Sequence, residues 1–115
     1  MEITSREVGS VTVVTVHGRM TADESNGRVK ETIGDLIAKG RKQVVVNLEG
    51  ISYMDSGGLG EMVACYASAN RAGGAVRLAN TTKRIKDLLI ITKLSTVFDM
   101  FESEADAVRS FGAAV

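Results

Sequence analysis

Asp55 and Ser56 place a carboxylate beside a hydroxyl at a point where the pattern of the chain changes. Residues 44–48 form an apolar run before them, and residues 59–71 have helical periodicity after them. A helix that begins here presents free backbone N–H groups and a partial positive charge, which suit a negative group such as a phosphate. Asp and Ser are also favoured helix N-caps. The residues alone therefore leave two interpretations open, a functional site at Ser56 or a simple cap.

Catalysis and metal binding are disfavoured by the residue types available. A serine hydrolase needs a base within reach of its nucleophile, and the only histidine is His17, at the end of a predicted strand. Ser56 does not stand in a G-x-S-x-G turn, because Met54 takes the first glycine position. One histidine and one cysteine, Cys65, cannot supply the four ligands of a structural zinc site. We expect no enzymatic activity, no metal and no cofactor.

Three glycines, Gly57, Gly58 and Gly60, follow a predicted strand and open a predicted helix, as phosphate-binding loops do. Their register fits neither G-x-G-x-x-G nor G-x-x-x-x-G-K-[ST]. No lysine follows within the turn, and Glu61 brings a negative charge instead. We interpret the glycines as positions that permit positive φ and close packing of helix on strand.

The composition limits the class of protein. The chain has 115 residues, is 44% hydrophobic, and carries 14 basic and 14 acidic side chains, so its formal net charge is zero. We expect one domain over residues 1–115 and no general affinity for nucleic acid or anionic membrane, which usually requires a basic excess. No apolar run approaches the ~20 residues that span a bilayer. The single cysteine fits a reducing compartment, so we expect a cytoplasmic location.

The first part of the chain predicts a hairpin. Residues 3–8 and 11–17 are rich in β-branched side chains and flank Gly9-Ser10, a pair that favours a type II′ turn. The second run is apolar or β-branched on both faces, which places it inside a sheet, and Gly18 is expected to end it.

A helix is predicted next. Thr21 and Glu24 have the spacing of a capping box, and Gly40 marks the C-terminal stop. An apolar stripe lies between them, made of Val29, Ile33, Leu36 and Ile37.

The rest of the chain alternates between strands and helices. Apolar runs at 44–48, 75–79 and 97–101 predict strands, with the last two separated by a helix that residues 80–82 can cap. A final short helix follows Ser103. This alternation predicts an α/β fold: a mixed, mainly parallel sheet opened by an antiparallel β-hairpin, with about four helices.

Residues 50–60 resemble the signature of bacterial anti-sigma factor antagonists, the STAS-domain family, whose members typically have Asp-Ser-Ser/Thr-Gly-Leu-Gly there. The resemblance covers most of the chain. It includes the strand, glycine and helix entry at 18–22, the third unit at 73–80, and the C-terminal segments at 88–94 and 98–101.

The resemblance implies a partner switch. In this family the unphosphorylated antagonist binds an anti-sigma factor that is also a serine kinase of the histidine-kinase-like ATPase fold. The kinase phosphorylates the signature hydroxyl, which weakens binding, and a metal-dependent serine phosphatase restores it. The antagonist is a substrate and a binding module, not an enzyme. The implied partner-binding surface consists of Thr21, Asp23, Asp55, Ser56, Gly57, Gly58 and Leu59.

Two residues depart from the family pattern. Gly57 stands at the second hydroxyl position, so Ser56 is the expected phosphorylation site, and the alternative is a non-phosphorylated STAS scaffold or adaptor in a signalling or transport complex. Lys93 stands where the family usually has glycine, which is expected to weaken the left-handed stop of the preceding helix.

Overall fold

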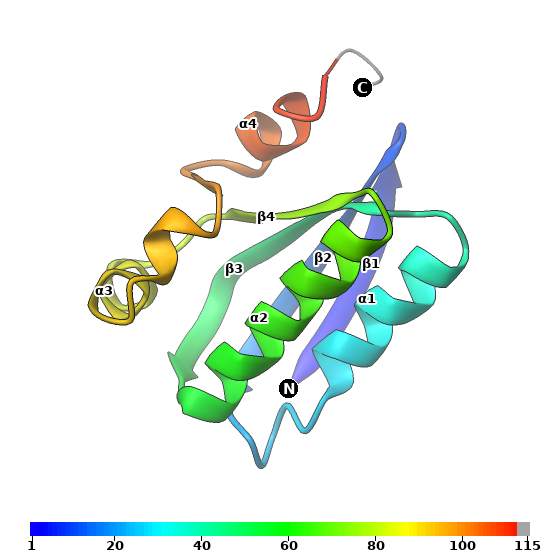
Figure 1. Ribbon diagram of the computed structural model, residues 1–115. Coiled ribbons are helices and arrows are strands. Elements are labelled where there is room, and N and C mark those ends of the chain that lie inside the picture. The colour runs from blue at the N-terminus through cyan, green and yellow to red at the C-terminus, as the bar shows by residue number, and fades with distance from the viewer. Residues whose placement is uncertain (113–115) are drawn as a thin grey trace.

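Five strands form one mixed sheet in the order β1-β2-β3-β4-β5 in the computed structural model, which describes residues 1–112 (Figure 1). The predicted hairpin is confirmed: β1 (Glu2–Val8) pairs antiparallel with β2 (Val11–Met20). In the turn between them only Gly9 has positive φ, at 61°, as a type II′ turn requires. The following strands all pair in parallel, namely β3 (Gln43–Met54), β4 (Ala75–Ala79) and β5 (Met100–Phe101).

Both central strands run further than the sequence predicted. Gly18 does not end β2 but lies inside it with φ 114°, and the register with β3 shifts on either side of it. Because glycine adopts this conformation without steric cost, the strand absorbs the irregularity and continues to Met20. β3 likewise continues to Met54, so it delivers the chain directly to Asp55.

Two helices, α1 (Arg28–Ala38) and α2 (Ser56–Arg71), lie side by side on one face of the sheet (Figure 1). The predicted stripe of α1 is confirmed, since Val29 and Ile33 are fully buried and the later two members pack half-buried against the same core. Gly40 has φ 85°, which is the predicted left-handed stop. The larger hydrophobic core fills the space between these helices and the sheet.

The start of α1 was predicted wrongly. The Thr21 hydroxyl accepts a hydrogen bond from the Glu24 N–H at 3.1 Å, but this bond closes a turn and not the helix. The chain then enters left-handed conformation at Asn26 (φ 42°) and Gly27 (φ 79°). Helical conformation cannot pass through two such residues, so α1 begins at Arg28.

The C-terminal part carries α3 (Lys83–Ile91), a short 3₁₀ helix (Leu94–Thr96) and α4 (Glu104–Arg109). The prediction that residues 80–82 cap α3 is confirmed at Thr82, whose hydroxyl accepts from the Ile85 N–H. α4 covers the opposite face of the sheet, where Ala107 and Val108 pack in a second, smaller core.

The last predicted strand and the expected weakness after α3 both need correction. β5 contains two residues only, because the 3₁₀ helix and the buried Phe98 occupy the segment before it. Lys93 adopts the left-handed conformation itself, with φ 63° and ψ 20°. The stop after α3 is therefore kept, at the steric cost that an L-residue incurs there.

Candidate functional site

The candidate site lies at the edge of the sheet where β3 ends and α2 begins. The carboxyl ends of β2 and β3 meet there, since these strands are parallel. Asp55 is the N-cap of α2 with an extended backbone (φ −100°, ψ −175°), and Ser56 is the first helical residue. The Ser56 side chain is exposed to solvent.

Asp55 resolves the question of which residue caps the helix. Its Oδ1 accepts from the Gly58 N–H at 2.9 Å and from the Ala22 N–H at 3.2 Å. Its own backbone N–H donates to the Met20 carbonyl at 3.3 Å. The hydrogen bond from Gly58, and after it that from Ala22, holds the pKa of the Asp55 carboxyl below its usual range. The Asp55 carboxylate thus connects the start of α2 to the turn after β2. Within residues 1–112, the Ser56 hydroxyl forms no hydrogen bond.

The glycines at the start of α2 are required by close contact. A Cβ at Gly57 would lie 2.7 Å from the Ala22 Cβ, and one at Gly58 would lie 1.9 Å from the Met20 carbonyl oxygen. The expectation of close helix-to-strand packing is confirmed at Gly58, which meets Met20 of β2, whereas Gly57 meets Ala22 in the turn after that strand. Neither glycine has positive φ, so that part of the interpretation is wrong. A second hydroxyl residue at position 57 does not fit unless the turn at Ala22 moves.

The turn after β2 brings two further predicted residues to this edge. Ala22, whose backbone N–H donates a hydrogen bond to the Asp55 carboxylate, is flanked in the chain by Thr21 and Asp23. Asp23 is exposed, whereas Thr21 is buried and its hydroxyl is engaged by the turn. Leu59 is only 8% exposed and belongs to the main core, so it offers little surface to a partner.

Glu61 has a structural role that the sequence analysis missed. It is buried, and its carboxylate accepts from the Ser25 hydroxyl, from the Gly27 N–H at 3.3 Å and from the Lys30 N–H at 2.9 Å. Gly27 gives α1 no side-chain cap of its own. Glu61 therefore caps α1 from across the helix pair, and no local pattern could reveal this because its partners lie more than 30 residues away.

The remaining candidate groups have other surroundings. Burial raises the pKa of the Cys65 thiol to about 12, so this cysteine is a packing residue and not a nucleophile. Within residues 1–112, no three His, Cys, Asp or Glu side chains gather closely enough to hold a metal ion. No helix of that part of the chain has the length and apolar character to cross a membrane.

Comparison with known proteins gives a consistent assignment. A family model described as the STAS domain matches residues 2–107. The anti-sigma-B factor antagonist of Bacillus subtilis is 38% identical over 62 residues, which are 54% of this chain and 57% of that protein. The chain is thus matched to little more than half the length of this relative.

Solved structures share the fold. A putative anti-sigma factor antagonist from Thermotoga maritima superposes with a TM-score of 0.86 at 19% identity, covering 94% of this chain and 92% of that chain. The Bacillus cell fate determinant SpoIIAA in its phosphorylated form gives a TM-score of 0.75 at 18% identity, with coverages of 96% and 100%. At these identities the likeness concerns the fold alone.

Proposed function

Because the chain belongs to the STAS domain family, we propose that it is an anti-sigma factor antagonist whose binding is switched by phosphorylation of Ser56. Its partner is an anti-sigma factor that is also a serine kinase, and a serine phosphatase reverses the modification. The protein acts in the cytoplasm as a binding module and kinase substrate, not as an enzyme.

The observation that carries this proposal is that Asp55 and not Ser56 caps α2. Because the Asp55 carboxylate accepts the capping hydrogen bond, the exposed Ser56 hydroxyl is not needed to cap the helix. A phosphate there adds about −1.5 to −2 charges and three acceptor oxygens. The N-terminus of α2 favours a negative charge by about 0.3–1 kcal/mol, so the fold tolerates the modification.

The proposed partner surface surrounds this hydroxyl. Of the seven residues expected there, Asp23, Asp55, Ser56 and Gly57 are accessible and would contact the partner. Thr21, Gly58 and Leu59 are buried, and we propose that they hold the accessible residues in position. Gly60 is exposed and has open space around it, which leaves an approach for the active site of a kinase. The surface already carries the Asp55 carboxylate and the exposed Asp23, so a phosphate adds to like charge. Against a partner surface without a compensating cation, such an addition costs several kcal/mol, or about 100-fold or more in affinity.

A kinase assay tests the proposed site. Wild-type protein, Ser56→Ala and Ser52→Ala are incubated with the cognate anti-sigma kinase and Mg-ATP, and the phosphate is located by fragment mass. Ser52 is a matched control, since it is exposed on β3 close to the site in sequence. We expect phosphate on Ser56 in the wild type and in Ser52→Ala, and none in Ser56→Ala. Undiminished phosphorylation of Ser56→Ala would exclude the site, and absence of phosphate in all three would favour the non-phosphorylated scaffold.

A further inference from the structure

One edge of β3 is unpaired over half of the strand. Pairing between β3 and β4 ends at Asn47 and Ala79, whereas pairing between β3 and β2 continues to Met54 and Met20. Residues 48–54 therefore have a neighbouring strand on one side only within the described part of the chain. An unpaired edge of this kind leaves backbone N–H and C=O groups for a further strand. Within the segment, the Glu49 N–H is already engaged, since it donates to the Asn47 side chain at 3.0 Å.

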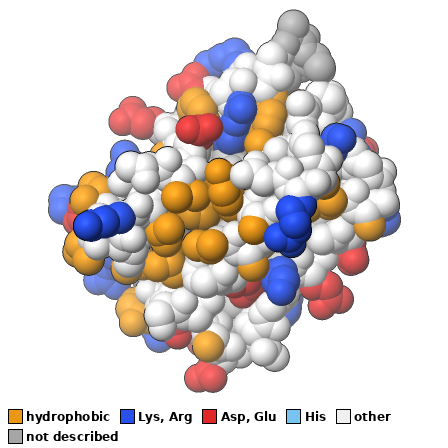
Figure 2. Space-filling model, viewed as in Figure 1, with side chains coloured by type: hydrophobic (Ala, Val, Ile, Leu, Met, Phe, Trp, Pro, Cys, Tyr) orange, Lys and Arg blue, Asp and Glu red, His pale blue; other side chains and the backbone are white. Residues whose placement is uncertain are grey.

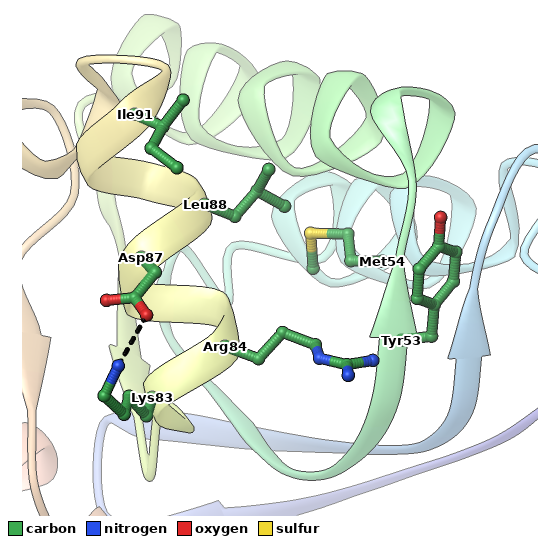
Figure 3. Close-up of a pocket in the computed structure, with 7 residues that line it drawn as sticks. All are labelled: Tyr53, Met54, Lys83, Arg84, Asp87, Leu88 and Ile91. Carbon is green, nitrogen blue, oxygen red and sulfur yellow. Dashed lines mark hydrogen bonds and ion pairs between the residues drawn. The ribbon is translucent and has the colours of Figure 1, made fainter.

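A hollow lies at the C-terminal end of this edge, at Tyr53 and Met54. It has a volume of about 530 Å³ and is bounded by Tyr53 and Met54 of β3 and by one face of α3, including Arg84, Leu88 and Ile91. Figure 3 shows Leu88 and Met54 facing one another across it, with the Arg84 side chain extending from α3 toward the strand. Hydrophobic side chains gather over the region between α2 and α3 (Figure 2). The hollow thus places an apolar surface beside the last two residues of the open edge.

The apolar character of this face is unusual for exposed surface. Ile91, which lines the hollow, is 78% exposed, and its neighbour Ile90, which lies outside the lining, is 59% exposed. Together with Tyr53 they are the exposed large hydrophobic side chains of residues 1–112. Apolar groups gathered beside an open strand edge mark an interaction surface more often than isolated exposed residues do.

The charges around the hollow select the occupant. Lys83 is paired with Asp87 at 2.8 Å, while Arg84 takes part in none of the ion pairs formed within residues 1–112. The lining therefore carries one uncompensated positive charge. A second copy of this chain would present the same positive edge to itself, so charge disfavours self-pairing and favours a segment that carries carboxylates.

We propose that the open edge of β3 and the hollow at its end together form a groove that binds an extended, acidic and apolar segment of a partner protein. This segment pairs with residues 48–54 as an additional strand of the sheet. The alternation of side chains along a strand would direct one set toward Met54, Leu88 and Ile91 and leave carboxylates near Arg84. Seven residues span up to about 23 Å at about 3.3 Å per residue. The open edge ends at Met54, two residues before Ser56 in the chain, so the bound segment would lie close to the partner surface proposed above. Strand addition itself requires no phosphate.

A peptide probe tests strand addition directly. The probe is acetyl-Glu-Val-Asp-Leu-Glu-Val-amide, and its two controls are the same peptide with lysine at the acidic positions and the same peptide N-methylated at alternate backbone amides. Amide hydrogen exchange of residues 48–54 and methyl NMR shifts of Leu88 and Ile91 are followed during titration of the full-length chain. We expect saturable protection of β3 amides by the acidic peptide at millimolar concentration or below, and at least tenfold weaker binding of both controls.

Variants locate the charge contribution. Arg84→Glu should weaken binding of the acidic peptide at least tenfold and reverse the preference over the lysine peptide. Lys86→Glu, on the same helix but outside the groove lining, should leave binding within twofold. Equal binding of the N-methylated peptide, or no protection by the acidic peptide, overturns strand addition. Concentration-dependent self-association that protects the same amides without peptide overturns it in favour of a second copy. None of these outcomes depends on whether Ser56 is phosphorylated.

Discussion

Removal of the Glu61 carboxylate is the sharpest test of how the turn after β2 and α1 are held in place. Glu61 is 9% exposed and accepts hydrogen bonds from Ser25, Gly27 and Lys30. Ser25 is fully buried, so its hydroxyl cannot turn to bulk water when the acceptor is lost. In Glu61→Ala these donors lose their partner together, and α1 loses the only side chain that caps it within residues 1–112.

The size of the effect follows from these contacts. A hydrogen bond to a charged group contributes about 1.5–3 kcal/mol, and loss of a helix cap costs about 0.5–2 kcal/mol. The contributions overlap, because water can enter the space left by the side chain and serve the N–H groups at the start of α1. We expect Glu61→Ala to lower the free energy of unfolding by about 3 kcal/mol, or the Tm by about 12 °C at roughly 4 °C per kcal/mol. Glu61→Gln keeps one acceptor oxygen and should lose about half as much.

Urea denaturation followed by circular dichroism measures these differences. Glu31→Ala is the matched control, because Glu31 lies in the first turn of α1 but is exposed, so it contributes little beyond the helix dipole. That control should change stability by no more than about 0.5 kcal/mol. A loss for Glu61→Ala as small as that of Glu31→Ala would refute the role of Glu61 as the cap of α1.

Three further predictions concern the junction and the stop after α3. Hydrogen bonds from α2 and from Ala22 lower the folded-state pKa of Asp55. Its contribution to the free energy of unfolding is therefore complete above the ordinary aspartate pKa of about 4 and is lost as pH falls through the lower folded value. The free energy of unfolding should depend less steeply on acid pH in Asp55→Asn than in the wild type, and equal slopes would contradict this. Gly57→Ser should destabilise the fold by about 1–3 kcal/mol because it crowds Ala22, whereas Gly60→Ser, with open space around it, should be neutral or slightly stabilising in thermal unfolding. Lys93→Gly should stabilise the protein by about 0.5 kcal/mol, because glycine adopts the left-handed conformation without steric cost. The higher conformational entropy of glycine in the unfolded chain offsets only part of this gain, and a loss of stability would contradict the prediction.

Features set by neighbouring residues could be predicted from the sequence. Gly9-Ser10 determined the hairpin turn, and Val29 and Ile33 identified the buried face of α1. The cap of α3 was narrowed to residues 80–82 for the same reason, because cap and helix are adjacent, and the structure assigns it to Thr82. The parallel part of the sheet followed from apolar runs that alternate with helices.

Features that depend on distant contacts could not be predicted. The sequence offered both Asp55 and Ser56 as the cap of α2. The structure assigns the cap to Asp55, which accepts from the Gly58 N–H and also from the Ala22 N–H, 33 residues away in the chain. The start of α1 depends on Glu61, which reaches it from another helix. Gly18 suggested the end of a strand because glycine often interrupts one. Its irregular pairing with β3, which lets β2 continue, depends on a strand distant in sequence.

The most direct test of the central claim is the affinity of the phosphorylated and unmodified protein for the anti-sigma kinase. Both forms are purified, their Tm values are compared, and their dissociation constants are measured by calorimetry with a non-hydrolysable ATP analogue present. We predict that phosphate on Ser56 changes the Tm by no more than about 4 °C, because the modified residue lies at the exposed N-terminus of α2. We also predict that it weakens binding by about 100-fold or more. Equal dissociation constants for the two forms would contradict the switch.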